Sequence, residues 1–327
     1  MVLGAGAIGG SIGGKLAAAG QEVALIARGP HLEALRRDGL ELRDPDQVAR
    51  HHLPAHGSPA EAGLVAGDVV LLATKSQQTQ AALEALARAL GPRRDEVVVV
   101  CAQNGVENER MALRLFERVY GMRVVVAATH LEPGVVELAT APVFGLLDIG
   151  RFPAGSDETA EAVAADLVGA GFDAVATDDV MSFKYLKLLG NLGNAIEAAC
   201  GPGIDDGPAK ELLELARAEA LEVYAAAGIK TADEEVERAR RARRGPLRMA
   251  AGRERTGGSS WQSLARGTGD IEADYLNGEI VLLGRLHSLP TPANALLRQV
   301  ADELAAGRRP PGTIAPAELL ARLEGGA

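Results

Sequence analysis

A glycine-rich turn at the very start of the chain restricts the fold more than any other feature. The apolar residues Met1 to Leu3 run into this turn, and Ser11 to Gly20 has the pattern of a helix. A strand, a G-x-G-x-x-G turn and a helix form a site for a dinucleotide pyrophosphate: the first glycine permits the tight turn, the second lets backbone approach the phosphates, and the third lets the helix pack on the strand. An ordinary glycine-rich turn is the alternative, but the strand–turn–helix context favours cofactor binding. The predicted contacts are Gly4, Gly6, Ala7, Ile8 and Gly9.

The end of the second expected strand indicates which dinucleotide is bound. Glu22 to Ala27 is a short apolar run, and Arg28 follows it directly. An NAD-preferring site usually places an Asp or Glu here to bind the ribose 2′-hydroxyl. A guanidinium can instead pair with a 2′-phosphate, which a carboxylate would repel. A surface arginine is common after any strand, but the position and the missing acid favour NADP(H).

The composition excludes several classes of protein. The chain has 327 residues, enough for two domains, and its net charge of −10 with only 3% aromatic residues argues against nucleic-acid and anionic-membrane partners. No apolar run approaches the roughly 18 residues of a membrane span, and we expect no signal peptide and a cytoplasmic protein. Cys101 and Cys200 are expected to be reduced structural thiols. The histidines at 51, 52 and 56 lack acidic or cysteine partners, so no metal site is expected.

Strands and helices alternate through the first half of the chain. Continuous apolar runs at Gly67–Thr74 and Asp95–Ala102 predict parallel strands buried on both faces. Val124–Leu131 and Val135–Leu138, separated by a Pro-Gly turn, predict a hairpin at the sheet edge. Further helices are expected at Gln77–Leu90 and Asp157–Ala170, and a last strand at Asp173–Thr177. These segments predict an α/β fold with a doubly wound Rossmann-type parallel sheet, an NADP(H)-binding domain over residues 1–178.

From about Asp178 onwards the periodic segments are helical, which predicts an all-helical substrate domain over residues 179–327. The expected helices are Met181–Cys200, Pro208–Ala227, Ala232–Arg244, Asp270–His287 and Pro292–Ala306, with a short terminal helix after Gly307–Gly312. The basic stretch Arg238 to Arg244 could suggest nucleic acid. In an acidic protein it favours a solvated helix end instead, facing its own C-terminal dipole.

Polar side chains at strand ends and on one helix are the candidates for chemistry. Lys75 and Asn104 each follow an expected strand, at the sheet edge where doubly wound folds bind ligands. Lys187, Asn191 and Asn194 have the spacing of one helix face. A lysine among leucines and alanines is costly to bury without a partner or a task, and burial lowers its pKa toward that of a useful acid. A lysine snorkelling at the domain junction is the alternative, and Lys184 fits that structural role better.

A set of short motifs, in order along nearly the whole chain, resembles the ketopantoate reductase family. They are Gly4–Gly9, Ala27–Gly29, Thr74-Lys75, Gln103–Gly105, Thr129-His130, Lys187 with Asn191, Ser259-Ser260 and Glu272–Gly278. The resemblance implies reduction of 2-dehydropantoate to (R)-pantoate with NADPH, in the pathway to pantothenate and coenzyme A. It implies that Lys187 is the general acid and that Glu272 positions the reacting group and contacts the cofactor. It also implies substrate contacts from Asn104, Asn191, Asn194 and Ser259, and cofactor contacts from Arg28, Lys75 and Asn104.

Two departures from the family pattern fall among the substrate-contacting residues. The family's second asparagine stands eight residues after the lysine, where this chain has Ala195, and Asn194 comes one residue earlier. One residue turns a helix by about 100°, so Asn194 cannot point where the family's asparagine does. The family's Ser-Ser-Met-Leu-Gln-Asp is Ser259-Ser260-Trp261-Gln262-Ser263 here. Reduction of another 2-oxo acid, β-hydroxyacid dehydrogenase activity and an NADP-sensing regulatory role therefore stay open, and so does a homodimer.

Overall fold

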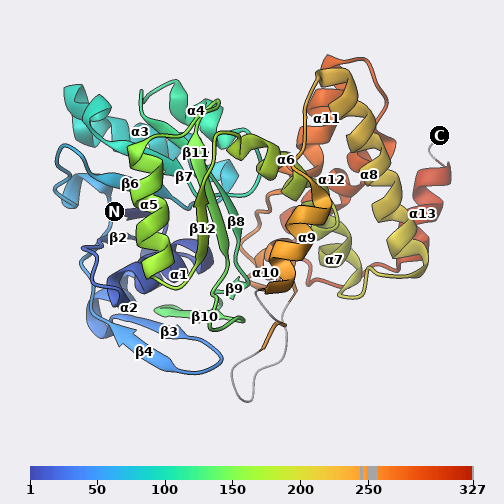
Figure 1. Ribbon diagram of the computed structural model, residues 1–327. Coiled ribbons are helices and arrows are strands. Elements are labelled where there is room, and N and C mark those ends of the chain that lie inside the picture. The colour runs from blue at the N-terminus through green and yellow to red at the C-terminus, as the bar shows by residue number, and fades with distance from the viewer. Residues whose placement is uncertain (244–245, 249–256, 326–327) are drawn as a thin grey trace. The chain divides into compact units, whose positions relative to one another are not determined.

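The structure is a computed structural model that describes residues 1–243, 246–248 and 257–325 (Figure 1). The chain divides into two compact units: unit 1 comprises Met1–Lys184 and Asp233–Glu254, and unit 2 comprises Tyr185–Ala232 and Arg255–Ala327. The first unit thus ends at Lys184, a little beyond the expected boundary at residue 178. One segment of the second half of the chain, which begins at Asp233, also belongs to unit 1.

Unit 1 is built on an eight-stranded sheet, in which β8 and β11 are antiparallel and the other neighbours are parallel. In spatial order its strands are β12 (Asp173–Ala176), β11 (Leu146–Arg151), β8 (Val119–Val125), β7 (Val98–Cys101), β6 (Val69–Leu72), β1 (Val2–Leu3), β2 (Leu25–Ile26) and β5 (Ala55–His56). From β1 the chain goes first to one side and then, through β6, to the other. This reversal confirms the predicted doubly wound Rossmann-type fold.

Apolar side chains on both faces of this sheet form the core of unit 1. Val2 of β1 belongs to one buried cluster and Leu3 to another, because successive side chains of a strand point to opposite faces. The helices of unit 1 are α1 (Ala7–Ala18), α2 (Gly29–Asp38), α3 (Thr79–Leu90), α4 (Asn108–Leu113), α5 (Glu158–Gly169) and α9 (Glu234–Arg243), with short 3₁₀ turns η1 (Pro59–Glu61), η2 (Ser76–Gln78) and η3 (Gly91–Glu96). Arg244, the predicted last residue of α9, lies outside the described residues.

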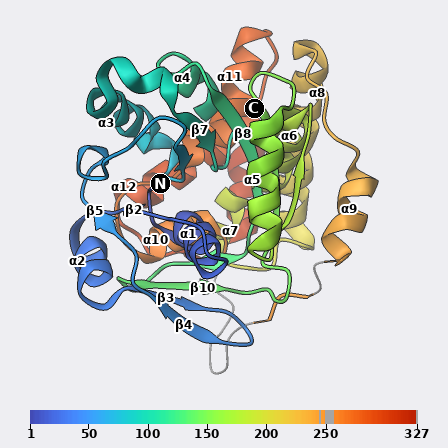
Figure 2. The same ribbon diagram turned by 60° about the vertical axis from the view of Figure 1, so that its left-hand side comes forward.

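A second, four-stranded sheet lies beneath α1 (Figure 2). Its order is β4 (Val48–His51), β3 (Leu40–Arg43), β10 (Val135–Leu138) and β9 (Ala128–Thr129). The expected hairpin exists, since β9 and β10 are antiparallel, but its placement at the edge of the main sheet was wrong. β10 pairs with β3 instead, and α1 packs closely on both strands: a Cβ on Gly10 would lie 2.8 Å from Val136, and one on Gly14 would lie 3.0 Å from Leu40. The glycines of α1 thus let the helix cover β3 and β10.

Unit 2 is helical, as predicted. It holds the end of α6 (Val180–Asn191), followed by α7 (Asn194–Cys200), α8 (Gly207–Ala227), α10 (Ser259–Ala265), the 3₁₀ turn η4 (Ala273–Tyr275), α11 (Asn277–Leu286), α12 (Pro292–Ala306) and α13 (Pro316–Gly325). No helix among the described residues is both long and apolar enough to span a bilayer.

Two of the expected long helices are interrupted. The helix expected over Met181–Cys200 is two helices, α6 and α7, separated at Leu192-Gly193. The Leu192 carbonyl accepts a hydrogen bond from the buried Asn277 side chain at 3.2 Å, a tertiary contact that helical periodicity does not report. The helix expected over Asp270–His287 begins only at Asn277, because Leu276 has non-helical torsions, with φ −115° and ψ −90°.

Candidate functional site

The glycine turn connects β1 to α1, and each of its glycines meets a different constraint. Gly4 has a φ of +104°, and a Cβ there would lie 2.8 Å from the Thr74 amide nitrogen. A Cβ on Gly9 would lie 2.1 Å from the Gly4 carbonyl oxygen. A Cβ on Gly6, in contrast, would meet no atom within 4 Å. Sterics therefore require glycine at 4 and 9, whereas Gly6 leaves its backbone open to a ligand.

The start of α1 offers amide groups to that open space. Gly6 is the N-cap residue, its cap has no side-chain hydrogen bond, and the first turn of α1 carries no acidic residue. The first N–H groups of a helix lack partners within the helix and lie at the positive end of its dipole, so they favour an anion. The turn also lies next to the β1–β6 boundary, the switch point of a doubly wound sheet. These residues fit a dinucleotide pyrophosphate.

Arg28 lies at the carboxyl ends of the same strands. It is the N-cap residue of α2 after β2, and its exposed guanidinium donates a 3.2 Å hydrogen bond to the Gln78 side-chain oxygen, which follows β6. Since β1 lies between β2 and β6, this pair spans the end of the strand that leads into the glycine turn. A neutral amide partner leaves the positive charge of Arg28 available to an anion such as a 2′-phosphate.

A hydrogen-bond network ties together the loops that carry Lys75 and Asn104. The Gln103 side-chain nitrogen donates to the Thr74 carbonyl at 2.8 Å and to the Thr79 hydroxyl oxygen at 2.7 Å. The buried Asn108 side chain donates to the Asn104 carbonyl at 2.8 Å. The two loops follow neighbouring strands, β6 and β7, and the network makes them one rigid edge. The structure thus brings these two predicted site residues to the same edge of the sheet.

Lys184 has a structural role, as expected, but it is buried, at 3% exposure, and does not snorkel. Its ammonium group pairs with the buried Glu109 carboxylate of α4 and donates to the Gln103 carbonyl at 3.1 Å. Burial raises the pKa of Glu109, and the nearby Lys184 charge opposes that rise. The ion pair therefore holds Lys184 to α4, and the hydrogen bond holds it to the loop after β7.

In unit 2, the predicted substrate residues lie on three neighbouring helices. Lys187 and Asn191 lie one turn apart on α6 and are half-buried. Asn194 begins α7, and its side-chain nitrogen lies 3.5 Å from the Ser259 hydroxyl oxygen at the start of α10. The Asn191 side-chain nitrogen is buried and has no hydrogen-bond partner among the residues that the structure describes. Leaving a buried donor unpaired costs free energy. Such a donor is therefore a candidate for a hydrogen bond to a bound ligand.

The shared face predicted for Lys187, Asn191 and Asn194 is therefore wrong for Asn194, because the break at Leu192-Gly193 places it on a different helix. Its neighbour in the structure is Ser259, which the sequence connected to it only through the family resemblance. Glu197 of α7 was missed: its carboxylate accepts from the Gly258 amide at 2.9 Å and so holds the start of α10.

Glu272 is buried, at 6% exposure, and immediately precedes η4. Burial lowers the pKa of the nearby Arg266 guanidinium, and the charges of Asp270 and Glu272 oppose that shift. Asn277, the last polar residue of the same motif, is structural: its side-chain nitrogen bonds the Leu192 carbonyl and, at 3.1 Å, the Asn294 side-chain oxygen. The Glu272–Gly278 motif thus supports the α6–α7 break.

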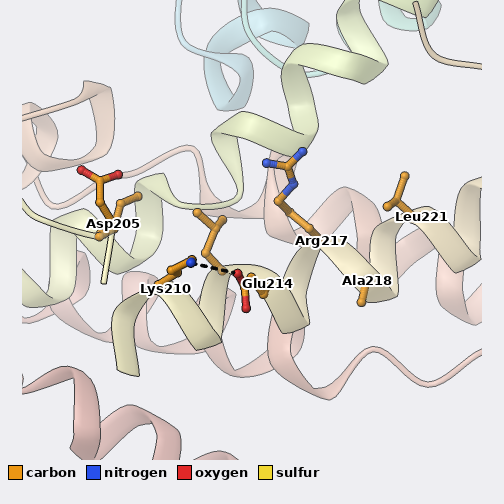
Figure 3. A pocket seen from close by; sticks show the side chains of 8 residues that line it. Asp205, Lys210, Glu214, Arg217, Ala218 and Leu221 are labelled. Atoms are coloured by element: carbon orange, nitrogen blue, oxygen red, sulfur yellow. Dashed lines mark ion pairs between the residues drawn. The ribbon is translucent and has the colours of Figure 1, made fainter. Parts of the chain in front are cut away.

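A surface pocket of about 470 Å³ lies along α8 in unit 2 (Figure 3). Asp205 and Glu214 line it together with Lys210 and Arg217, and Lys210 pairs with Glu214 at 3.6 Å. None of the predicted site residues lines it, and its mixed charges give no preference for an anionic substrate. Among the described residues, no group of three or more His, Cys, Asp or Glu side chains could hold a metal ion.

Comparison with protein families matches both halves of the chain. Residues 1–153 match the family model described as "Ketopantoate reductase PanE/ApbA", and residues 179–305 match its "C terminal" counterpart. The chain belongs to the ketopantoate reductase family. This confirms the resemblance that the motifs indicated.

Relatives in this family carry a consistent name. A "2-dehydropantoate 2-reductase" of Halobacterium salinarum is 31% identical, covering 92% of this chain and 96% of that protein. A protein of the same name from Mesorhizobium japonicum is 31% identical, over 92% and 97%. A crystal structure of a PanE/ApbA family ketopantoate reductase from Ralstonia eutropha has a TM-score of 0.76 at 30% identity, covering 94% and 98%. D-mandelate dehydrogenase with NADH and anilino(oxo)acetate shares the fold, with a TM-score of 0.80 at 22% identity over 94% and 98%.

Proposed function

We propose that this chain catalyses the NADPH-dependent reduction of 2-dehydropantoate to (R)-pantoate. The observation that carries the proposal is the glycine turn: an open Gly6 between two sterically required glycines, at the switch point of the sheet, in a member of the ketopantoate reductase family. Relatives that match over nine-tenths of the chain are named 2-dehydropantoate 2-reductase, which supports the choice of substrate.

The residues of unit 1 would hold the cofactor, and NADPH when bound would supply a hydride from nicotinamide C4 to the C2 carbonyl. The α1 amides at Gly6, Ala7, Ile8 and Gly9 would bind the pyrophosphate. Arg28 would bind the 2′-phosphate, and its neutral partner Gln78 supports this role. Lys75 and Asn104, at the rigid edge after β6 and β7, would contact cofactor and substrate.

The residues of unit 2 would act on the oxo acid. Lys187 would donate a proton to the C2 oxygen as negative charge develops there. Asn191, with its unpaired buried amide nitrogen, would bind the substrate together with Asn194 and Ser259. Glu272 would keep the reacting groups in position. A cytoplasmic location and a homodimer stay predictions.

Reduction of a different 2-oxo acid is the second candidate. It is favoured by Asn194, which starts its own helix beside Ser259 and stands one residue earlier than the family's asparagine. β-Hydroxyacid dehydrogenase activity and a purely NADP-sensing role are less well supported, because the Ser259 and Glu272 motifs are those of ketopantoate reductases.

A panel of 2-oxo acids tests these candidates, with NADPH or NADH oxidation followed by absorbance. We expect the highest kcat/KM with 2-dehydropantoate and NADPH. A higher value with another 2-oxo acid would favour the second candidate. Cofactor binding without turnover of any acid would favour a sensor, and no binding of either nucleotide would contradict the proposal.

A further inference from the structure

His31 is a half-buried histidine whose two ring nitrogens both contact backbone atoms. It lies in the first turn of α2, three residues after Arg28. Its Nε2 lies 2.8 Å from the carbonyl oxygen of Ala5, inside the glycine turn. Its Nδ1 lies 2.9 Å from the amide nitrogen of Gly134, in the turn between β9 and β10. One side chain thus connects three segments of unit 1.

The partners of His31 determine where its proton lies. The Gly134 amide can only donate, so Nδ1 must be the acceptor. A neutral imidazole then carries its hydrogen on Nε2, which donates to the Ala5 carbonyl. The His130 ring lies against His31, with centroids 4.2 Å apart. Burial, and then the neighbouring His130, lower the pKa of His31 to about 4, so the neutral form with both hydrogen bonds persists at neutral pH.

The bond to Ala5 acts on the next amide of the chain. The Ala5 carbonyl and the Gly6 N–H belong to one planar trans peptide, in which they point in opposite directions. Holding the carbonyl toward His31 therefore directs the Gly6 N–H away from His31. Gly6 is the residue of the turn with open space around it.

We propose that His31 is a positioning residue for dinucleotide binding, which fixes the Ala5–Gly6 peptide of the pyrophosphate-binding turn through its Nε2–H. The inference rests on the proposed function, since it requires a dinucleotide at that turn. His31 itself touches no ligand in this scheme. The pyrophosphate is common to both nicotinamide dinucleotides, so His31 should affect NADPH and NADH equally. Arg28, in contrast, should act on NADPH alone.

Fluorescence titration of the full-length chain with NADPH and with NADH tests this inference. His31→Leu removes both hydrogen bonds and should raise the Kd for NADPH and the Kd for NADH by the same factor. We expect about tenfold, which corresponds to the net free energy of one neutral hydrogen bond. The kcat at saturating NADPH should stay within about twofold of wild type, because the loss is in binding alone. His31→Gln can keep a donor near the Nε2 position and should bind both dinucleotides nearly as wild type does, whereas His31→Asn should not. The exposed His287→Leu is the matched control.

Three results would overturn the inference. Unchanged affinity in folded His31→Asn would show that the Ala5 contact has no part in binding. A loss confined to NADPH would mean that His31 acts through Arg28. If His31→Leu fails to fold, the comparison of His31→Gln with His31→Asn decides, and equal affinities would contradict the role. In each case wild-type binding of NADPH leaves the proposed function standing, whereas a wild type that binds neither dinucleotide removes both proposals.

Discussion

Lys184 and Lys187 are three residues apart on α6 and meet different surroundings. The charge of Lys184 is balanced by Glu109 inside unit 1, whereas Lys187 is half-buried in unit 2. We therefore expect Lys187→Ala to lower kcat by about a hundredfold or more, the usual effect of losing a general acid, with little change in Tm. Steady-state kinetics and thermal unfolding measure this, with the exposed Lys230→Ala as control. An unchanged kcat would exclude Lys187 as the acid.

Arg28 should determine the choice between the two dinucleotides. Its guanidinium donates to the neutral Gln78 side chain and forms no ion pair with a carboxylate among the described residues. Arg28→Ala should weaken NADPH binding by about 1.5–3 kcal/mol, the value of a charge-assisted hydrogen bond, and leave NADH binding unchanged. Titration with both nucleotides measures the difference. Arg37→Ala, an exposed arginine of the same helix that pairs with Asp38, should change neither affinity.

Asp302 of α12 should make the stability of unit 2 depend on pH. Burial, and then the Asp274 carboxylate, raise the pKa of Asp302 to about 6, and Arg298 opposes the rise. The folded state thus binds this proton more tightly than the unfolded state, so stability falls as pH rises from about 4 to about 6. Asp302→Asn should raise Tm above about pH 6, and the gain should disappear near pH 4. The exposed Asp205→Asn should show no such dependence.

Single residues were predictable where a local rule governs them. The roles of Gly4, Gly6 and Gly9 followed from their spacing, and the structure bears out the steric requirement at Gly4 and Gly9. His31 could not be found in this way, because its partners are backbone atoms 26 and 103 residues away. Asn277 belongs to the predicted Glu272–Gly278 motif, but its structural role depends on the Leu192 carbonyl, which is freed by a helix break that periodicity does not show.

At the scale of elements, α9 is the clearest departure from expectation. Arg240 is not solvated at a helix end: it pairs with Asp173 of β12 at 2.6 Å and with the buried Asp148 of β11. Arg123 of β8, 1% exposed, bonds Asp148 at 2.7 Å and pairs with Glu237 of α9. Arg240 of the basic stretch thus belongs to a buried ion cluster that holds α9 on the main sheet, whereas Arg238 is exposed as expected.

Removing one member of this cluster should be strongly destabilising. Asp148→Asn would leave the buried guanidinium of Arg123 and that of Arg240 without their shared carboxylate. Breaking a buried pair in this way costs about 3–5 kcal/mol. Urea unfolding measures the loss, and Arg238→Ala, an exposed arginine of the same helix, should cost less than about 0.5 kcal/mol. Equal stability of both variants would show that the cluster does not anchor α9.

Elements were predicted well when their own pattern sufficed. The apolar runs of β6 and β7 and the whole of α12 appear where expected. Of the small sheet only the β9–β10 hairpin was predicted. β3 and β4 were not, since each has four residues and β3 pairs with β10, far along the chain, where Glu41 lies opposite Val135. A single helix was expected where the structure has α6 and α7. The hydrogen bond from Asn277 to the Leu192 carbonyl at the break is a tertiary contact, which the local pattern does not show.

At the scale of the whole molecule, the proposed tasks are divided between two units that the chain enters more than once. The residues assigned to the cofactor belong mainly to unit 1. The residue assigned to proton transfer, Lys187, belongs to unit 2, as do the substrate residues other than Lys75 and Asn104. The division predicts that cofactor affinity and turnover can be changed independently. A ligand that binds only the folded state stabilises it by RT ln(1 + [L]/Kd), about 2.7 kcal/mol at a hundredfold excess over Kd.

Calorimetry of wild type and two variants therefore separates the two tasks. We expect NADPH to raise the Tm of wild type and of Lys187→Ala by the same amount, because Lys187 serves the oxo acid. Arg28→Ala should show a smaller rise at the same NADPH concentration, because a weaker Kd reduces the stabilisation. NADH should raise the Tm of wild type and Arg28→Ala equally. A Lys187→Ala protein that no longer responds to NADPH would place Lys187 in cofactor binding and would contradict the proposed division.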